Sequence, residues 1–197
     1  MFNSSNTKQT SMKQLLFSAL ALCTVVACNN AATSTEATTD TTTTPVTAAS
    51  NEMVTYAYTP EYSGDFETGD PKNAQLILEL WKDYDNNTLD NHKDAFADSV
   101  TFDLAGGTTV SGPRDSVLNG MKEYRGGFVS AVSTVVAVTT LKPKGKDESW
   151  VCVWGKEIDI DKKNKKDSIF LNENWMFNKD GKIAYMAQYQ AKPPVKK

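Results

Sequence analysis

Residues 70–191 alternate between two hydrophobic periods, and each change of period marks the boundary of a predicted element. From 71 to 86, apolar side chains recur every three or four residues, which is the spacing of a helix with one buried stripe. Asp70 before Pro71 is typical of a helix start, and Asn86-Asn87 is typical of a helix end. The first predicted helix is therefore 71–86, with a stripe made of Ala74, Ile77, Leu80, Trp81 and Tyr84.

Two further helices are predicted before residue 128. A short one covers about 90–96. Ser111-Gly112-Pro113 repeats the pattern of a small capping residue shortly before proline, so a third helix is expected to begin there. It should end at about Arg125, because Gly126-Gly127 follows.

The remaining segments alternate with period two, as strands do. The first, 99–104, places Val100, Phe102 and Leu104 on one face and Asp103 on the other. Helices followed by antiparallel hairpins predict an α+β fold, with three N-terminal helices packed on a strongly curved, mainly antiparallel sheet. The later strands are expected over about 128–141, 148–161, 168–178 and 182–191.

The last hairpin raises the question of a buried acid. A turn over 178–181 predicts that Phe177 lies opposite Ile183, Trp175 opposite Tyr185 and Glu173 opposite Ala187. All six would share the apolar face, so Glu173 would be a carboxylate in an apolar wall. It is either an acid that contacts a ligand or half of a structural ion pair, for instance with Lys156.

The N-terminal composition indicates an exported and anchored protein. Residues 1–27 carry Lys8 and Lys13, no acid, and a short apolar run, which is typical of a signal peptide, whether translation starts at Met1 or Met12. The run ends in small residues before Cys28, which resembles the lipobox of bacterial lipoproteins. Residues 28–52, rich in threonine, are expected to be a disordered tether, and 53–197 a single domain. The expected location is the cell envelope, on the outer membrane, through lipid on Cys28.

Charge and rare residues exclude several functions. The net charge is −3, and loss of the two leader lysines makes it more negative, which disfavours nucleic acid as a partner. Beyond the leader and Cys28 only Cys152 remains, so neither an internal disulfide nor a cysteine metal site is expected. His92 is the single histidine. No cofactor or metal is therefore predicted.

Three segments together resemble the SnoaL-like group of the nuclear-transport-factor-two-like (NTF2-like) superfamily: FADSVTF at 96–102, SGPRDSV at 111–117 and WMFNKDGKI at 175–183. The resemblance implies a cone-shaped α+β fold with a pocket between the concave sheet and the helices. Members of this group bind small, mostly apolar molecules, and a minority are isomerases, cyclases or dehydratases.

The ketosteroid isomerase branch of that superfamily has three catalytic positions that can be compared with this sequence. Its base falls on Leu104 and its tyrosine on Leu80, while its second acid falls on Glu173. Asp103 is expected to face outward unless a bulge turns it inward. Glu173, Asp103 and His92 are therefore only candidate catalytic residues.

We favour a lipid-anchored, non-catalytic protein that binds a small apolar or amphipathic molecule. The alternatives are an isomerase- or cyclase-like enzyme that uses Asp103 or His92 with Glu173, and a homodimeric interaction module. The aromatic residues can line a pocket or fill the core. The expected ligand contacts are Glu173, Trp175, Leu104, Leu80, Tyr84, Trp154 and Tyr185.

Overall fold

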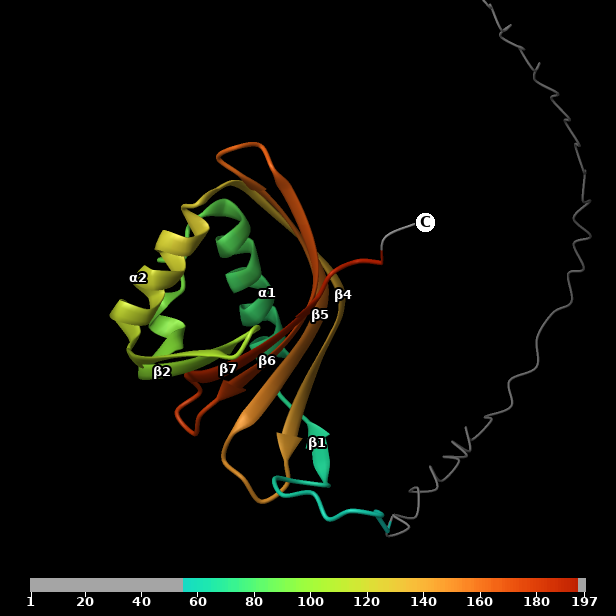
Figure 1. The fold of residues 1–197 in the computed structure, drawn as a ribbon. Helices are drawn as coiled ribbons and strands as arrows, with labels where there is room; N and C mark the ends of the chain where they lie inside the picture. The colour runs from blue at the N-terminus through green and yellow to red at the C-terminus, as the bar shows by residue number, and fades with distance from the viewer. Residues whose placement is uncertain (1–54, 195–197) are drawn as a thin grey trace, which may run out of the picture. The chain divides into compact units, whose positions relative to one another are not determined.

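The computed structural model describes residues 55–194. The predicted signal peptide, Cys28 and the tether lie outside this range. The described part is a mixed α+β fold in which two α-helices cover the concave face of a curved seven-stranded sheet (Figure 1). The helices are α1 (Pro71–Asn86), the 3₁₀ helix η1 (Lys93–Ala95) and α2 (Arg114–Arg125). The strands are β1 (Phe66–Thr68), β2 (Phe96–Leu104), β3 (Thr108–Pro113), β4 (Phe128–Pro143), β5 (Ser149–Asp161), β6 (Lys166–Phe177) and β7 (Ile183–Ala191).

The sheet order is β1-β4-β5-β6-β7-β2-β3, and every neighbouring pair is antiparallel except β2 and β7. The parallel pair joins the N-terminal and C-terminal halves of the described fold. The α+β prediction and the mainly antiparallel sheet are therefore confirmed.

The first helix begins and ends as its sequence predicts. The side chain of Asp70 accepts a hydrogen bond from the backbone N–H of Lys72 at 2.9 Å, and Pro71 follows as the first helical residue. Asn87 adopts a left-handed conformation with φ of 58°, and this ends the helix. Ile77, Leu80 and Trp81 are buried against the sheet, so the predicted stripe faces the core.

The other two helix predictions need correction. The helix expected over 90–96 is reduced to the three residues of η1, because Phe96 is already extended and pairs with Ile183 of β7. Ser111-Gly112-Pro113 is the end of β3 rather than a helix cap, so α2 begins at Arg114, although it ends at Arg125 as predicted. Pairing with β2 keeps this segment extended, and the Ser111 and Thr101 hydroxyls are hydrogen-bonded at 2.7 Å.

Trp81 of α1 packs closely on Gly155 of β5, beside a bulge in the sheet. A Cβ atom at Gly155 would lie 2.5 Å from Cζ3 of Trp81, so only glycine lets this indole pack directly on the strand. The register of β4 against β5 shifts between Val135 and Ala137, beside Gly155. Such a bulge bends the strand and increases its twist.

The final hairpin is also shifted by a bulge, which changes the predicted pairs. Phe177 lies opposite Ile183 as predicted, but the register then slips, so Trp175 lies opposite Met186 and Glu173 opposite Gln188. The predicted Trp175–Tyr185 and Glu173–Ala187 pairs are wrong. A slip of one residue exchanges the two faces of a strand, so Tyr185, Ala187 and Tyr189 belong to the outer face.

Candidate ligand-binding cavity

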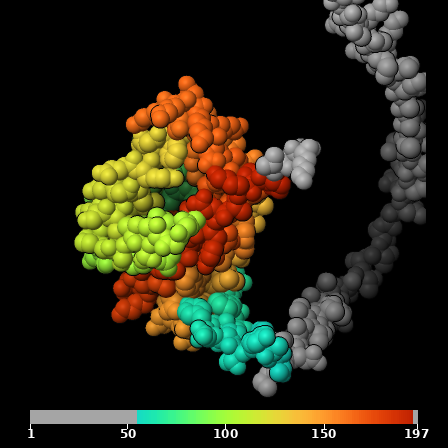
Figure 2. All heavy atoms as spheres, viewed as in Figure 1, coloured from blue at the N-terminus to red at the C-terminus, as the bar shows by residue number. Residues whose placement is uncertain are grey.

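A cavity of about 430 Å³ lies between the concave face of the sheet and the two helices. Its opening is the hollow in Figure 2, bordered by α2 in yellow, the β2–β3 region in yellow-green and the later strands in orange and red. Most of its wall is apolar. The lining residues are Leu80, Trp81, Tyr84, Leu89, Phe96, Phe102, Leu104, Ala105, Thr108, Val110, Val117, Gly120, Met121, Tyr124, Ser133, Glu157, Ile169, Leu171, Glu173, Trp175, Met186, Gln188 and Gln190.

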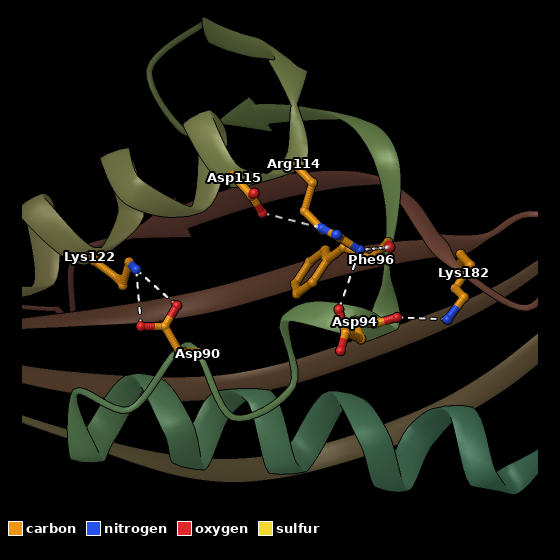
Figure 3. Close-up of polar contacts among 7 residues, drawn as sticks. All are labelled: Asp90, Asp94, Phe96, Arg114, Asp115, Lys122 and Lys182. Carbon is orange, nitrogen blue, oxygen red and sulfur yellow. Dashed lines mark hydrogen bonds and ion pairs between the residues drawn. The ribbon is translucent and has the colours of Figure 1, made fainter.

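The helix α2, one wall of the cavity, is fixed at both ends. Near its start, Arg114 donates to the carbonyl of Phe96 at 3.3 Å and pairs with Asp94 at 3.7 Å (Figure 3). Further along, the Lys122 ammonium pairs with Asp90 at 2.8 Å. These contacts tie the helix to the segment that precedes β2.

The last residue of α2 ties this helix to α1. Arg125 is buried and donates to the carbonyls of Tyr84 at 2.6 Å, Asp85 at 2.8 Å and Phe128 at 3.1 Å. Its donors are directed at backbone carbonyls, and Arg125 is not among the residues that line the cavity.

Glu173 lies on the cavity wall, as the alternation of β6 predicts, and it is only 6% exposed. One carboxylate oxygen accepts hydrogen bonds from the indole N–H groups of Trp81 at 2.7 Å and Trp175 at 3.0 Å. The other accepts from the amide of Gln188 at 2.9 Å. Burial raises the pKa of Glu173, although these three hydrogen bonds act in the opposite direction.

The ion pair considered between Glu173 and Lys156 does not form. Lys156 lies opposite Phe170 in the β5–β6 register, whereas Glu173 lies opposite Val153. Since successive residues of a strand alternate between faces, the two side chains point to opposite sides of the sheet. The partners of Glu173 are therefore neutral donors.

A second group of acids on the same face was not singled out from the sequence. Glu157 lines the cavity, and Asp159, two residues later on β5, is 6% exposed with one carboxylate oxygen unpaired. Burial raises the pKa of Glu157, and the adjacent Asp159 raises it further. Burial likewise raises the pKa of Asp159. The signal was present, because Val151, Val153, Gly155, Glu157 and Asp159 alternate with the outward-facing tryptophans of β5.

Five of the seven predicted ligand contacts line the cavity: Glu173, Trp175, Leu104, Leu80 and Tyr84. The other two do not. Trp154 is 42% exposed on the outer face. The hydroxyl of Tyr185 instead donates to Asp103 at 2.6 Å, also on the outer face, because of the bulge in β7.

Two candidate catalytic residues lie away from the cavity. Asp103 faces outward, as predicted, and accepts hydrogen bonds from Thr109 and Tyr185, which lower its pKa. His92 lies beside α1, with Nδ1 2.6 Å from the Asp83 carboxylate and Nε2 3.3 Å from that of Glu79. Neither residue shares the cavity with Glu173.

Within residues 55–194, no three His, Cys, Asp or Glu side chains are grouped so that they could hold a metal ion. In the same range, no helix combines the length and the apolar character needed to cross a bilayer.

Comparisons with known proteins identify the fold. No protein-family model matches the chain, and no curated protein sequence matches it. A putative scytalone dehydratase from Novosphingobium aromaticivorans has a TM-score of 0.51 and 12% identity over 62% of this chain and 86% of its own. An LEH-like epoxide hydrolase from M. tuberculosis has a TM-score of 0.50 and 12% identity over 61% of this chain and 79% of its own.

An NTF2-like protein of unknown function from Cytophaga hutchinsonii is 17% identical, with a TM-score of 0.43, over 59% of this chain and 97% of its own. At such identities the likeness concerns the fold alone. The chain therefore shares the α+β fold with a curved sheet of the scytalone dehydratase and epoxide hydrolase structures.

Proposed function

We propose that this protein uses its NTF2-like fold to bind a small, mainly apolar or amphipathic molecule, as a SnoaL-like binding protein rather than an enzyme. The observation that carries the proposal is the cavity of about 430 Å³, which is within the usual size range of small-molecule sites. Its wall combines aromatic and aliphatic side chains with a few polar groups, the usual composition of such a site.

The positions of Asp103 and His92 argue against the acid–base enzyme that would pair either of them with Glu173. Glu173 already accepts three hydrogen bonds from the protein. Asp103 and His92, the partners considered for it, lie outside the cavity. General acid–base transfer needs groups within hydrogen-bond reach of the same substrate, and neither pair meets this condition.

The test uses a substitution, Gly120→Phe, that narrows the cavity opening without disturbing the core. Gly120 of α2 lines the cavity, and a Cβ atom there would meet nothing within 4 Å. We expect wild-type protein to bind 2-naphthalenemethanol in isothermal titration calorimetry, and Gly120→Phe to weaken binding by about tenfold or more, since its ring would occupy the opening. The matched control is Asn119→Phe, one residue earlier and exposed, which should bind as wild type.

Equal binding by Gly120→Phe and wild type would contradict the proposal. Native mass spectrometry of the purified protein adds an independent measurement. A co-purified small molecule should be present in wild type and in Asn119→Phe, and reduced in Gly120→Phe.

We further propose that lipid on Cys28 anchors the domain in the cell envelope, on the outer membrane. The support is the apolar run that ends in small residues before this cysteine. Cys28→Ala should move the protein from the membrane fraction to the soluble fraction, whereas Cys152→Ala should leave it in place. Incorporation of labelled fatty acid into wild type, and its loss in Cys28→Ala, checks the chemistry directly.

A homodimer is a second proposal, favoured by the outer face of the sheet. Val132, Trp154, Phe170 and Tyr189 are each more than 40% exposed and lie on this face according to the strand register. Exposed apolar side chains gathered on one face are typical of an association surface.

A further inference from the structure

Glu157 on the cavity wall and the neighbouring Asp159 on the same face of β5 have no ion-pair partner among the described residues. We call Glu157 and Asp159 the carboxyl pair. They lie near the C-terminal ends of α1 and α2. Ser133, opposite Glu157 in the β4–β5 register, donates to Asp85 of α1 at 2.8 Å, and Arg125 of α2 is near enough to lower the pKa of Asp159. Among residues 55–194, neither member of the pair forms a salt bridge, and the buried Asp159 retains an unpaired oxygen.

The two acids on the cavity wall differ in what they can offer a ligand. Glu173 is occupied by three N–H donors of the protein. Glu157 lines the same cavity but receives no hydrogen bond from an N–H donor of the described residues; its neighbour in hydrogen-bonding position is the carboxyl of Asp159. Glu157 is therefore the acid on the cavity wall that can still accept hydrogen bonds from a ligand.

Positive charge is missing from the cavity wall. Its lining includes two glutamates but no lysine, arginine or histidine. Arg125 is near enough to influence Asp159, yet its guanidinium donates to three backbone carbonyls and lies over the Tyr84 ring at 5.7 Å. A buried carboxylate that lacks a cation is costly, so a ligand that supplies one gains affinity.

We propose that the ligand is an amphipathic amine whose ammonium group binds at Glu157, beside Asp159, while its apolar body lies along the rest of the cavity. This inference rests on the proposed binding function and names the class of ligand. Tyr84 and Tyr124 line the cavity near the carboxyl pair and supply aromatic rings, which also favour a cation. The apolar body would contact Phe102 and Trp175, whose rings pack with centroids 5.9 Å apart.

Binding of the amine should release a proton. Without ligand, burial and mutual repulsion favour a protonated carboxyl pair, and an ammonium group favours the ionised form. The proton therefore passes from the pair to the buffer when the ammonium group binds. The charged and titratable groups that face the pair are Glu173 and Asp167 on β6, Tyr84 and Asp85 on α1, and Tyr124 and Arg125 on α2.

The test compares three probes with one apolar body: 2-naphthylmethylamine, 2-naphthalenemethanol and 2-naphthoate. By isothermal titration calorimetry at pH 7, the amine should bind about tenfold more tightly than the alcohol, and the carboxylate most weakly. Glu157→Gln should remove the preference, so that this variant binds the amine and the alcohol about equally. Glu123→Gln, which changes the same charge at an exposed position of α2, should retain the preference.

Titrations in two buffers with different ionisation enthalpies measure the released proton, which should be detectable for wild type and absent for Glu157→Gln. Equal affinity for amine and alcohol, or a preference that survives in Glu157→Gln, would overturn the amine proposal while leaving the binding function intact. Tighter binding of the alcohol than of the amine would instead indicate that a protonated pair donates to a neutral ligand. Failure of all three probes to bind would overturn both proposals.

Discussion

Glu173 shows how a buried acid is accommodated without a positive charge. Two indole N–H groups and one amide converge on its carboxylate, so each oxygen has a donor. Charge-assisted hydrogen bonds of this kind are stronger than neutral ones and offset part of the cost of burial. The acid thereby joins α1, β6 and β7 at a single point.

Glu173→Gln tests this role. An amide in place of the carboxylate keeps only one oxygen, so its NH₂ group must face an N–H donor of the protein. We expect the free energy of unfolding to fall by about 1–3 kcal/mol, the cost of leaving buried donors unsatisfied. Urea unfolding followed by circular dichroism measures the change, with Glu123→Gln as an exposed control. A loss of stability no greater than in the control would refute the assigned role.

The carboxyl pair predicts how stability depends on pH. Since the folded-state pKa of Glu157 is raised, its protonated form is preferred in the folded protein. This contribution is fully present below the unfolded-state pKa and is lost as pH rises through the folded-state pKa. Glu157→Gln should therefore flatten the decrease in stability from mildly acid to neutral pH.

At pH 7 we expect Glu157→Gln to be more stable than wild type by at least about 1 kcal/mol, because a tenfold change in proton affinity is worth about 1.4 kcal/mol. Urea unfolding at pH 5, 6 and 7 provides the comparison. A steeper pH dependence in the variant than in wild type would be incompatible with the raised pKa.

The face on which a side chain lies was predictable where it depends only on the alternation within one strand. The outward Asp103 and the inward Glu173 follow from alternation within β2 and β6, which contain no irregularity at these positions. The prediction that Tyr185 lies on the apolar face was wrong, because the bulge that turns it outward depends on pairing between strands. The prediction that Trp154 contacts a ligand was wrong, because an aromatic side chain in a strand does not by itself show which face of the strand is buried.

At the scale of elements, local signals succeeded when no distant partner competed with them. The cap at Asp70 and the left-handed Asn87 define α1 entirely within its own sequence. The similar signal at Ser111-Gly112-Pro113 was misleading, because pairing with β2 extends this segment and delays α2. Strand pairing is a tertiary interaction, and it overrides local helix propensity.

Two glycines in different elements give opposite predictions for the same substitution. Gly155→Ala should lower the free energy of unfolding by about 1–3 kcal/mol, since the new methyl group would overlap the Trp81 ring. Gly120→Ala, in α2 with open space around it, should raise it by about 0.5–1 kcal/mol because alanine is the better helix former. Circular dichroism during urea unfolding measures both, and a stabilised Gly155→Ala would contradict the close packing of α1 on β5.

At the scale of the whole described fold, the sequence predicted the class but not the connectivity. The order of the four long C-terminal strands follows from short hairpin turns. The parallel pairing of β2 with β7 does not, because it joins segments more than 80 residues apart and has no local signal. The cavity depends on this pairing, since Phe102 of β2 and Met186 of β7 both line it.

The proposed dimer is tested at this scale. Trp154 lies in one row with Asn172 and Tyr189 across the outer face. We expect analytical ultracentrifugation to show a dimer for wild type and a monomer for Trp154→Lys, because a buried lysine without a partner would disfavour the interface. Tyr58→Lys introduces the same charge at an exposed position and should remain dimeric. A monomeric wild type would exclude this use of the outer face.

The two indoles that share one carboxylate oxygen of Glu173 also give the protein an internal optical reporter. Indole emission shifts in wavelength and intensity when its N–H partner or its polarity changes, and Trp81 and Trp175 both line the cavity. The other two tryptophans, Trp150 and Trp154, belong to the outer face and supply a background that cavity filling leaves untouched. Occupancy can therefore be followed on the unlabelled protein, even for a colourless guest.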